Sequence, residues 1–103
     1  MGVFIAAFEV LSGGDRVFHL HGELDMATVD ALLEGTVGAL DAPGDIVLDL
    51  TKLTFMDSSG LQAVVALAQR VDGGVVLRCP PPNVLRVLDI LGVNAAVGIR
   101  IES

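Results

Sequence analysis

The most polar short cluster in the sequence is F-M-D-S-S-G-L at residues 55–61, which lies between two strongly apolar runs. The run before it predicts a buried strand and the stripe after it predicts a helix. In α/β sheets, functional sites gather where strands end. The simplest interpretation makes Asp57 or Ser58 the cap of the helix, with Gly60 allowing a tight turn.

A role for one of the two serines as a modification target is compatible with that cap. A phosphate at a helix start is tolerated by the fold, because the free N–H groups and the helix dipole stabilise an anion. It would still add about −1.5 to −2 charges to the surrounding surface. The cluster therefore suits a switch that changes binding without unfolding the protein, although the local pattern does not rank Ser58 and Ser59.

Two rival interpretations, a serine hydrolase and a phospho-receiver domain with Asp49 or Asp57 as acceptor, fit less well. A nucleophile elbow needs G-x-S-x-G, whereas this chain has M-D-S-S-G around Ser58. The only histidines, His19 and His21, lie upstream at a strand spacing. We expect them to be half-exposed polar residues, because H-x-H without a third ligand is a weak metal signal. A phospho-receiver domain would need an adjacent acidic pair, and the sequence has none.

Composition narrows the class of protein further. The chain has 103 residues, of which 52% are hydrophobic, so it can bury a substantial core. Its net charge of −7 disfavours binding to nucleic acid or to an anionic membrane. The lone Cys79 excludes an internal disulfide and is expected to be a buried small hydrophobe. With no signal-peptide pattern and no run near the ~18 apolar residues of a membrane helix, we expect a soluble cytoplasmic protein.

Hydrophobic periodicity predicts an opening β-hairpin followed by alternating helices and strands. The expected strands span residues 4–11, 16–21, 45–50, 75–79 and 97–101. The expected helices span residues 29–40, 61–71 and 82–91. Asp25 or Thr28 is expected to cap the first helix. This order predicts a single α/β domain over residues 1–103, with amphipathic helices packed on a mainly parallel central sheet.

Two stretches and this order of elements resemble one family. L-H-G-E-L-D at residues 20–25 and D-I-V-L-D-L-T-K-L-T-F-M-D-S-S-G-L at residues 45–61 are similar to STAS domains. The first stretch is weak alone, but the second is specific. The resemblance spans nearly the whole chain and is strongest to stand-alone anti-sigma factor antagonists of bacteria.

The resemblance implies partner switching. Such proteins, when unphosphorylated, bind an anti-sigma factor that is also an ATP-dependent serine kinase, and so free the sigma factor. The kinase phosphorylates the D-S-S-G turn, and a PP2C-type phosphatase reverses this. Carried over to this sequence, Ser59 is the acceptor, and Asp25, Asp57, Ser58 and Gly60 are partner-binding residues.

The same resemblance implies a binding module that is not itself an enzyme. We expect a monomer, although the sequence leaves the oligomeric state open. ATP and Mg²⁺ belong to the kinase, so neither a cofactor nor a metal is expected in this chain, which agrees with the lack of a phosphate-loop motif. An alternative remains open: a STAS module that acts as a scaffold or as a sensor of a small ligand, without partner-switching phosphorylation.

Overall fold

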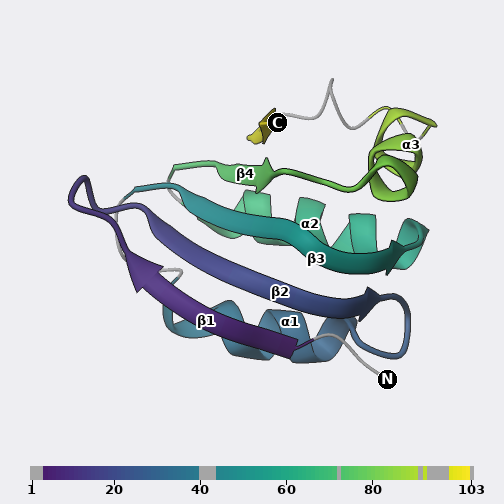
Figure 1. Ribbon diagram of the computed structural model, residues 1–103. Helices are drawn as coiled ribbons and strands as arrows, with labels where there is room; N and C mark the ends of the chain where they lie inside the picture. The colour runs from purple at the N-terminus through teal and green to yellow at the C-terminus, as the bar shows by residue number, and fades with distance from the viewer. Residues whose placement is uncertain (1–3, 40–43, 72, 91, 93–97, 103) are drawn as a thin grey trace.

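The computed structural model describes residues 4–39, 44–71, 73–90, 92 and 98–102. In this part of the chain, strands and helices alternate after an opening hairpin (Figure 1). The strands are β1 (Phe4–Val10), β2 (Arg16–Leu24), β3 (Ile46–Met56), β4 (Val75–Arg78) and β5 (Ile99–Glu102). The helices are α1 (Val29–Thr36), the short 3₁₀ helix η1 (Val37–Ala39), α2 (Ser58–Arg70) and α3 (Pro82–Ile90).

The five strands form one mixed sheet in the order β1-β2-β3-β4-β5. β1 is antiparallel to β2, and the other three neighbouring pairs are parallel. Helices α1 and α2 lie together behind the sheet, while α3 lies beside the end of β3 (Figure 1). The predicted α/β fold with an opening hairpin and a mainly parallel sheet is therefore confirmed.

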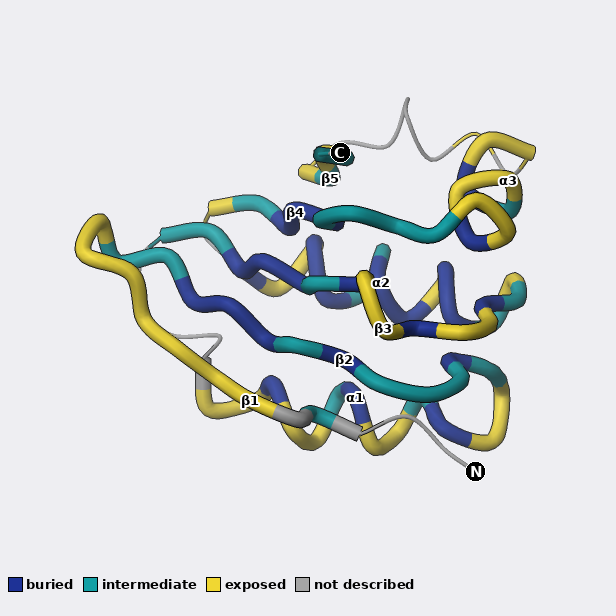
Figure 2. Tube along the Cα trace, viewed as in Figure 1, coloured by how far each residue is buried: buried dark blue, intermediate teal, exposed yellow. Residues whose placement is uncertain are grey.

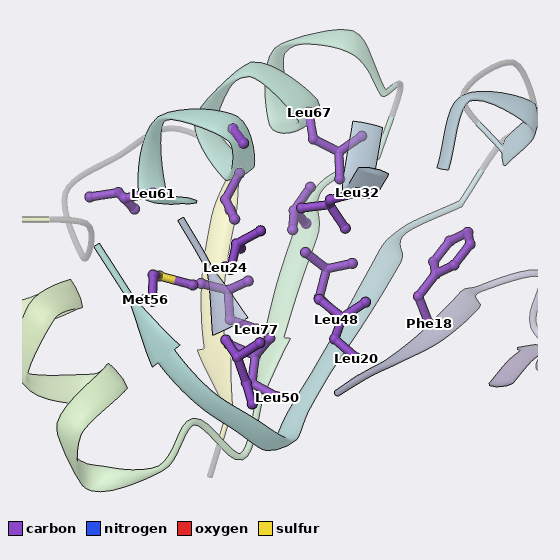
Figure 3. Close-up of a cluster of buried hydrophobic side chains, with 14 of the residues drawn as sticks. Phe18, Leu20, Leu24, Leu32, Leu48, Leu50, Met56, Leu61, Leu67 and Leu77 are labelled. Carbon is purple, nitrogen blue, oxygen red and sulfur yellow. The ribbon is translucent and has the colours of Figure 1, made fainter. Parts of the chain in front are cut away.

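The main core lies between the sheet and helices α1 and α2, and in Figure 2 the buried residues, in dark blue, are concentrated in the central strands and along these helices. Alternate residues of the central strands point into it, and Leu20, Leu48 and Leu77 are fully buried there. Figure 3 shows these side chains converging with Leu32 and Leu67 from the two helices. A separate small cluster alternates with them on the opposite face of the sheet, formed by Val17, Val47 and Val76.

The third strand is longer than predicted. The stretch T-K-L-T-F-M reads as a connection, but it continues β3 as far as Met56 and pairs with β2 throughout. The sequence pattern fails there because the ladder between β2 and β3 is irregular: His19 pairs with Asp49, but His21 pairs with Lys52. This bulge interrupts the alternation of buried and exposed positions, so the later part of the strand loses the expected pattern.

Gly35 in α1 lies against β1. A Cβ atom at Gly35 would collide with the end of the Ile5 side chain in β1, so a larger residue there would require that side chain to shift. The predicted end of this helix at Leu40 lies outside the described residues. So does Leu91 at the predicted end of the third helix.

One prediction about the fourth strand is wrong. Cys79 is half-exposed rather than buried, and its φ of +54° is a left-handed backbone conformation. The strand ends one residue earlier, at Arg78, and the chain turns there toward the three prolines. In the described residues, no helix is both long enough and apolar enough to cross a membrane.

Candidate functional site

The D-S-S-G cluster forms the junction between β3 and α2. Asp57 is the N-cap of α2, with Oδ1 accepting a hydrogen bond of 3.1 Å from the backbone N–H of Gly60. Its carbonyl oxygen accepts a second bond of 3.1 Å from the N–H of Leu61. The helix then begins with Ser58, which is exposed, and Ser59, which is half-buried. The predicted cap is thus Asp57, and both serine side chains lie in the first turn.

Gly60 joins this turn to the end of β2. It is buried, and a Cβ atom at this position would lie 2.7 Å from the carbonyl oxygen of Leu24 and 3.0 Å from Cγ of Met56. The same Leu24 carbonyl accepts a bond of 3.3 Å from the N–H of Asp57. Only glycine allows this approach of helix to strand, so Gly60 positions the two serines relative to the G-E-L-D segment.

The loop that follows G-E-L-D is held by its own hydrogen bonds. The carboxylate of Asp25 accepts from the N–H of Ala27 at 3.0 Å. The Thr28 hydroxyl accepts from the N–H of Asp25 at 2.9 Å and donates to the carbonyl of Glu23 at 2.8 Å. Thr28 occupies the N-cap position of α1, but its side chain makes no capping bond. The predicted cap therefore stabilises the loop rather than the helix.

The parallel register brings the two segments to one edge of the sheet. Leu24 pairs with Met56, so Asp25 and Asp57, which follow them, leave the sheet side by side. This edge lies at the right of Figure 1, where α2 begins. Two apolar side chains are exposed near the same ends: Met26, at 77% exposure, and Phe55, at 42%. The two carboxylates and the serines thus lie at an edge of the sheet whose neighbouring residues include exposed apolar side chains.

His19 forms its hydrogen bonds with carboxylates of the neighbouring strands rather than with the serines. Nδ1 of His19 lies 2.6 Å from Oδ2 of Asp49, and Nε2 lies 3.0 Å from Oε1 of Glu9. Both ring nitrogens are thus engaged by carboxylates from the neighbouring strands, which removes His19 as the base of a serine hydrolase. Both histidines are half-exposed, as predicted.

These hydrogen bonds also shift the pKa values of His19 and Asp49. The hydrogen bond to Glu9, followed by that to Asp49, raises the pKa of His19 above its ordinary 6.5. Partial burial alone would raise the pKa of Asp49, but hydrogen bonds from Thr51 and from His19 outweigh it and lower that pKa below 3.8. The sequence did not reveal this cluster, because hydrophobic periodicity identifies strands but not which residues face each other across them.

Metal binding finds no support in the described residues. No group of three or more His, Cys, Asp or Glu side chains there is arranged to hold a metal ion.

Comparison with known proteins agrees with this architecture. The family model of the STAS domain matches residues 10–102, which is most of the chain. The chain therefore belongs to the STAS domain family.

Three solved structures share the fold closely. The anti-sigma factor antagonist SpoIIAA in its unphosphorylated form is 25% identical over 94% of this chain and 87% of that chain, with a TM-score of 0.75. An anti-sigma factor antagonist from Mycobacterium paratuberculosis is 26% identical over 95% and 85%, with a TM-score of 0.78. A putative anti-sigma factor antagonist from Thermotoga maritima is 16% identical over 94% and 85%, with a TM-score of 0.79, and supports the fold alone.

Proposed function

We propose that this chain is a bacterial, cytoplasmic anti-sigma factor antagonist that works as a phosphorylation-controlled binding switch. The unphosphorylated form binds an anti-sigma factor with serine kinase activity and releases the sigma factor. Phosphorylation at Ser59 ends that binding, and a PP2C-type phosphatase restores it. The chain acts as a monomer and performs no catalysis of its own.

The observation that carries the proposal is the first turn of α2. Two adjacent hydroxyls lie there behind an N-cap that is already supplied by Asp57, so neither serine is needed to start the helix. Ser58 is exposed and Ser59 is half-buried, so neither residue is sealed in the core. The likeness to two anti-sigma factor antagonists at 25% and 26% identity supports the same role.

The charge at this edge explains how phosphorylation would act. Asp25 and Asp57 already make the surface acidic, and a phosphate brings about two further negative charges. A partner that has buried this edge would then meet unpaired like charge, which costs several kcal/mol. A loss of about 100-fold or more in affinity follows, because each 1.4 kcal/mol is about tenfold.

Exposure and family likeness favour different serines. Ser58 is the more exposed of the two, whereas the resemblance to the family assigns the acceptor to Ser59. The anti-sigma factor can be captured with the unphosphorylated protein and purified. Incubating it with ATP and each serine variant then tests which serine is the acceptor. We expect one phosphate on the wild type and on Ser58→Ala, and none on Ser59→Ala.

The effect of charge on partner binding is tested by comparing two aspartate variants. Ser59→Asp should weaken binding of the purified partner, whereas Gln69→Asp, with the same charge in the last turn of α2, should not. Phosphate that persists on Ser59→Ala would refute the assigned acceptor. Equal affinities for the two aspartate variants would refute the charge mechanism.

A further inference from the structure

The end of β3, just before the D-S-S-G turn, contains a bulge in its pairing with β2. Gly22 and Glu23 are consecutive residues of β2. Their partners on β3 are Leu53 and Phe55, so Thr54 is an extra residue in the ladder. Bulges are rare between parallel strands, and they are common next to functional sites, where they re-aim side chains. This bulge therefore lies where it can influence the turn that carries the two serines.

The extra residue sets which side chains at the end of β3 face the core. Leu53 and Met56 are each 2% exposed and belong to the main core, and Figure 3 shows Met56 among the core side chains. The two residues between them, Thr54 and Phe55, are exposed. Strict alternation would instead bring Phe55 to the core and turn Met56 to the opposite face. Because Asp57 follows Met56 directly, the position of the helix cap depends on this bulge.

Contacts from two other elements hold the bulge in place. The Thr54 hydroxyl donates a hydrogen bond of 3.0 Å to the carbonyl oxygen of Gly22 in β2. Gly22 has a φ of +101°, a backbone conformation that favours glycine. The Thr54 carbonyl oxygen accepts a bond of 2.9 Å from Nδ2 of Asn83, in the first turn of α3. The pairs that join β4 to β3 end at Asp49, so the Asn83 amide bonds a carbonyl that lies beyond that ladder.

We propose that Thr54 is a positioning residue, which holds β3 in the phase that presents the D-S-S-G turn, and that the Asn83 bond makes this phase depend on α3. The consequence for binding rests on the proposed function. A partner binds only molecules whose turn has the competent arrangement, so its apparent affinity falls with the fraction of such molecules. Loss of either hydrogen bond lowers that fraction, because a one-residue slip of the pairing becomes more accessible.

Hydrogen exchange of the full ¹⁵N-labelled chain tests the positioning without any partner. The N–H groups of Asp57 and Gly60 report on the turn, since they bond the Leu24 carbonyl and the Asp57 carboxylate. In Thr54→Val we expect both to exchange about three- to tenfold faster, the equivalent of one lost hydrogen bond. Thr54→Ser retains the hydroxyl and should restore the wild-type rates. Asn83→Ala should accelerate exchange at the same two groups from the side of α3.

Two control variants separate this local effect from a general loss of stability. Thr51→Val also removes a hydroxyl from β3, but one that bonds Asp49 at 2.6 Å. Arg86→Ala shortens an exposed side chain one turn further along α3. Both should leave exchange at residues 57 and 60 at the wild-type rate. Equal acceleration in Thr51→Val and Thr54→Val, or no acceleration in either Thr54→Val or Asn83→Ala, would overturn the proposal.

The purified anti-sigma factor then tests the consequence for binding. Thr54→Val should bind it more weakly than the wild type by a factor similar to the change in exchange, while Thr54→Ser and Thr51→Val should bind normally. Normal binding by Thr54→Val in spite of faster exchange would refute its part in the switch and leave Ser59 as the proposed acceptor. A wild type that binds no anti-sigma factor would refute the proposed function, while the exchange rates still decide whether Thr54 positions the turn.

Discussion

Gly60 packs so tightly on Leu24 that a Cβ atom at position 60 would lie 2.7 Å from the Leu24 carbonyl oxygen. Since Leu24 ends β2 and Gly60 lies in the first turn of α2, this contact fixes the serine-bearing turn to the G-E-L-D segment. The site thus depends on backbone proximity as well as on the polar side chains that the sequence displays.

Gly60→Ala should therefore destabilise the protein by about 1–3 kcal/mol, the usual cost of forcing an extra carbon into a packed site. The helix propensity of alanine acts in the opposite direction by about 1 kcal/mol, so the measured loss is a net value. Urea denaturation measures it. Gly38→Ala is the matched control, because a Cβ atom at Gly38 meets nothing within 4 Å. Equal stability of the two variants would contradict the contact.

Thr28 offers a second test, of the loop that carries Asp25. Thr28→Val keeps the shape but removes the hydroxyl that bonds Asp25 N–H and Glu23 carbonyl, and should cost about 1–3 kcal/mol. Thr28→Ser retains the hydroxyl and should lose only about 0.8 kcal/mol for the missing methyl group. Thermal denaturation distinguishes them, and faster hydrogen exchange at residues 25–28 is expected in the valine variant alone. A serine variant as unstable as the valine variant would show that packing, not hydrogen bonding, holds the loop.

Ser59→Asp should leave the fold intact if the site is a binding switch. The added charge lies in the first turn of α2, where the helix dipole favours it, while Asp57 nearby opposes it. We expect a change in unfolding free energy of no more than about 0.5 kcal/mol. Gln69→Asp puts the same charge in the last turn and should destabilise the protein by about 0.3–1 kcal/mol. A Ser59→Asp variant that is less stable than Gln69→Asp would argue against a switch that spares the scaffold.

Sequence patterns predicted the order of elements well, because strands and helices in this chain differ clearly in period. They left Asp57 and Ser58 as alternatives for the cap of α2, and the structure has Asp57. The expectation that Asp25 lies near the serines came from the resemblance to STAS domains, and the parallel register of β2 and β3 agrees with it. The sequence patterns did not predict the full length of β3, because a bulge near Lys52 breaks the alternation on which strand prediction depends. The cluster around His19 was not predicted for a related reason. Which residues lie opposite each other on neighbouring strands depends on the register, and the sequence of a single strand does not specify it.

The His19 cluster makes stability depend on pH in a defined direction. The pKa of His19 is raised in the folded state by Glu9 and Asp49, so its stabilisation is complete below the unfolded value of 6.5. It is lost as pH rises through the folded pKa. The lowered pKa of Asp49 acts on the acidic side: its share is present above 3.8 and is lost as pH falls through the folded value. The contribution of the cluster is therefore greatest between these limits.

The size of the effect is modest because the groups are partly exposed to solvent. Side-chain exposure is 29% for His19 and 55% for Glu9, so screening limits the contribution to about 1 kcal/mol or less. Urea midpoints measured across the neutral and alkaline range should fall with pH in the wild type. His19→Gln should flatten this part of the profile, and Glu9→Gln should reduce its slope by removing the first of the two carboxylate contacts. An unchanged alkaline slope in His19→Gln would mean that another group causes the decline, and that the imidazolium between β1 and β3 does not stabilise the sheet.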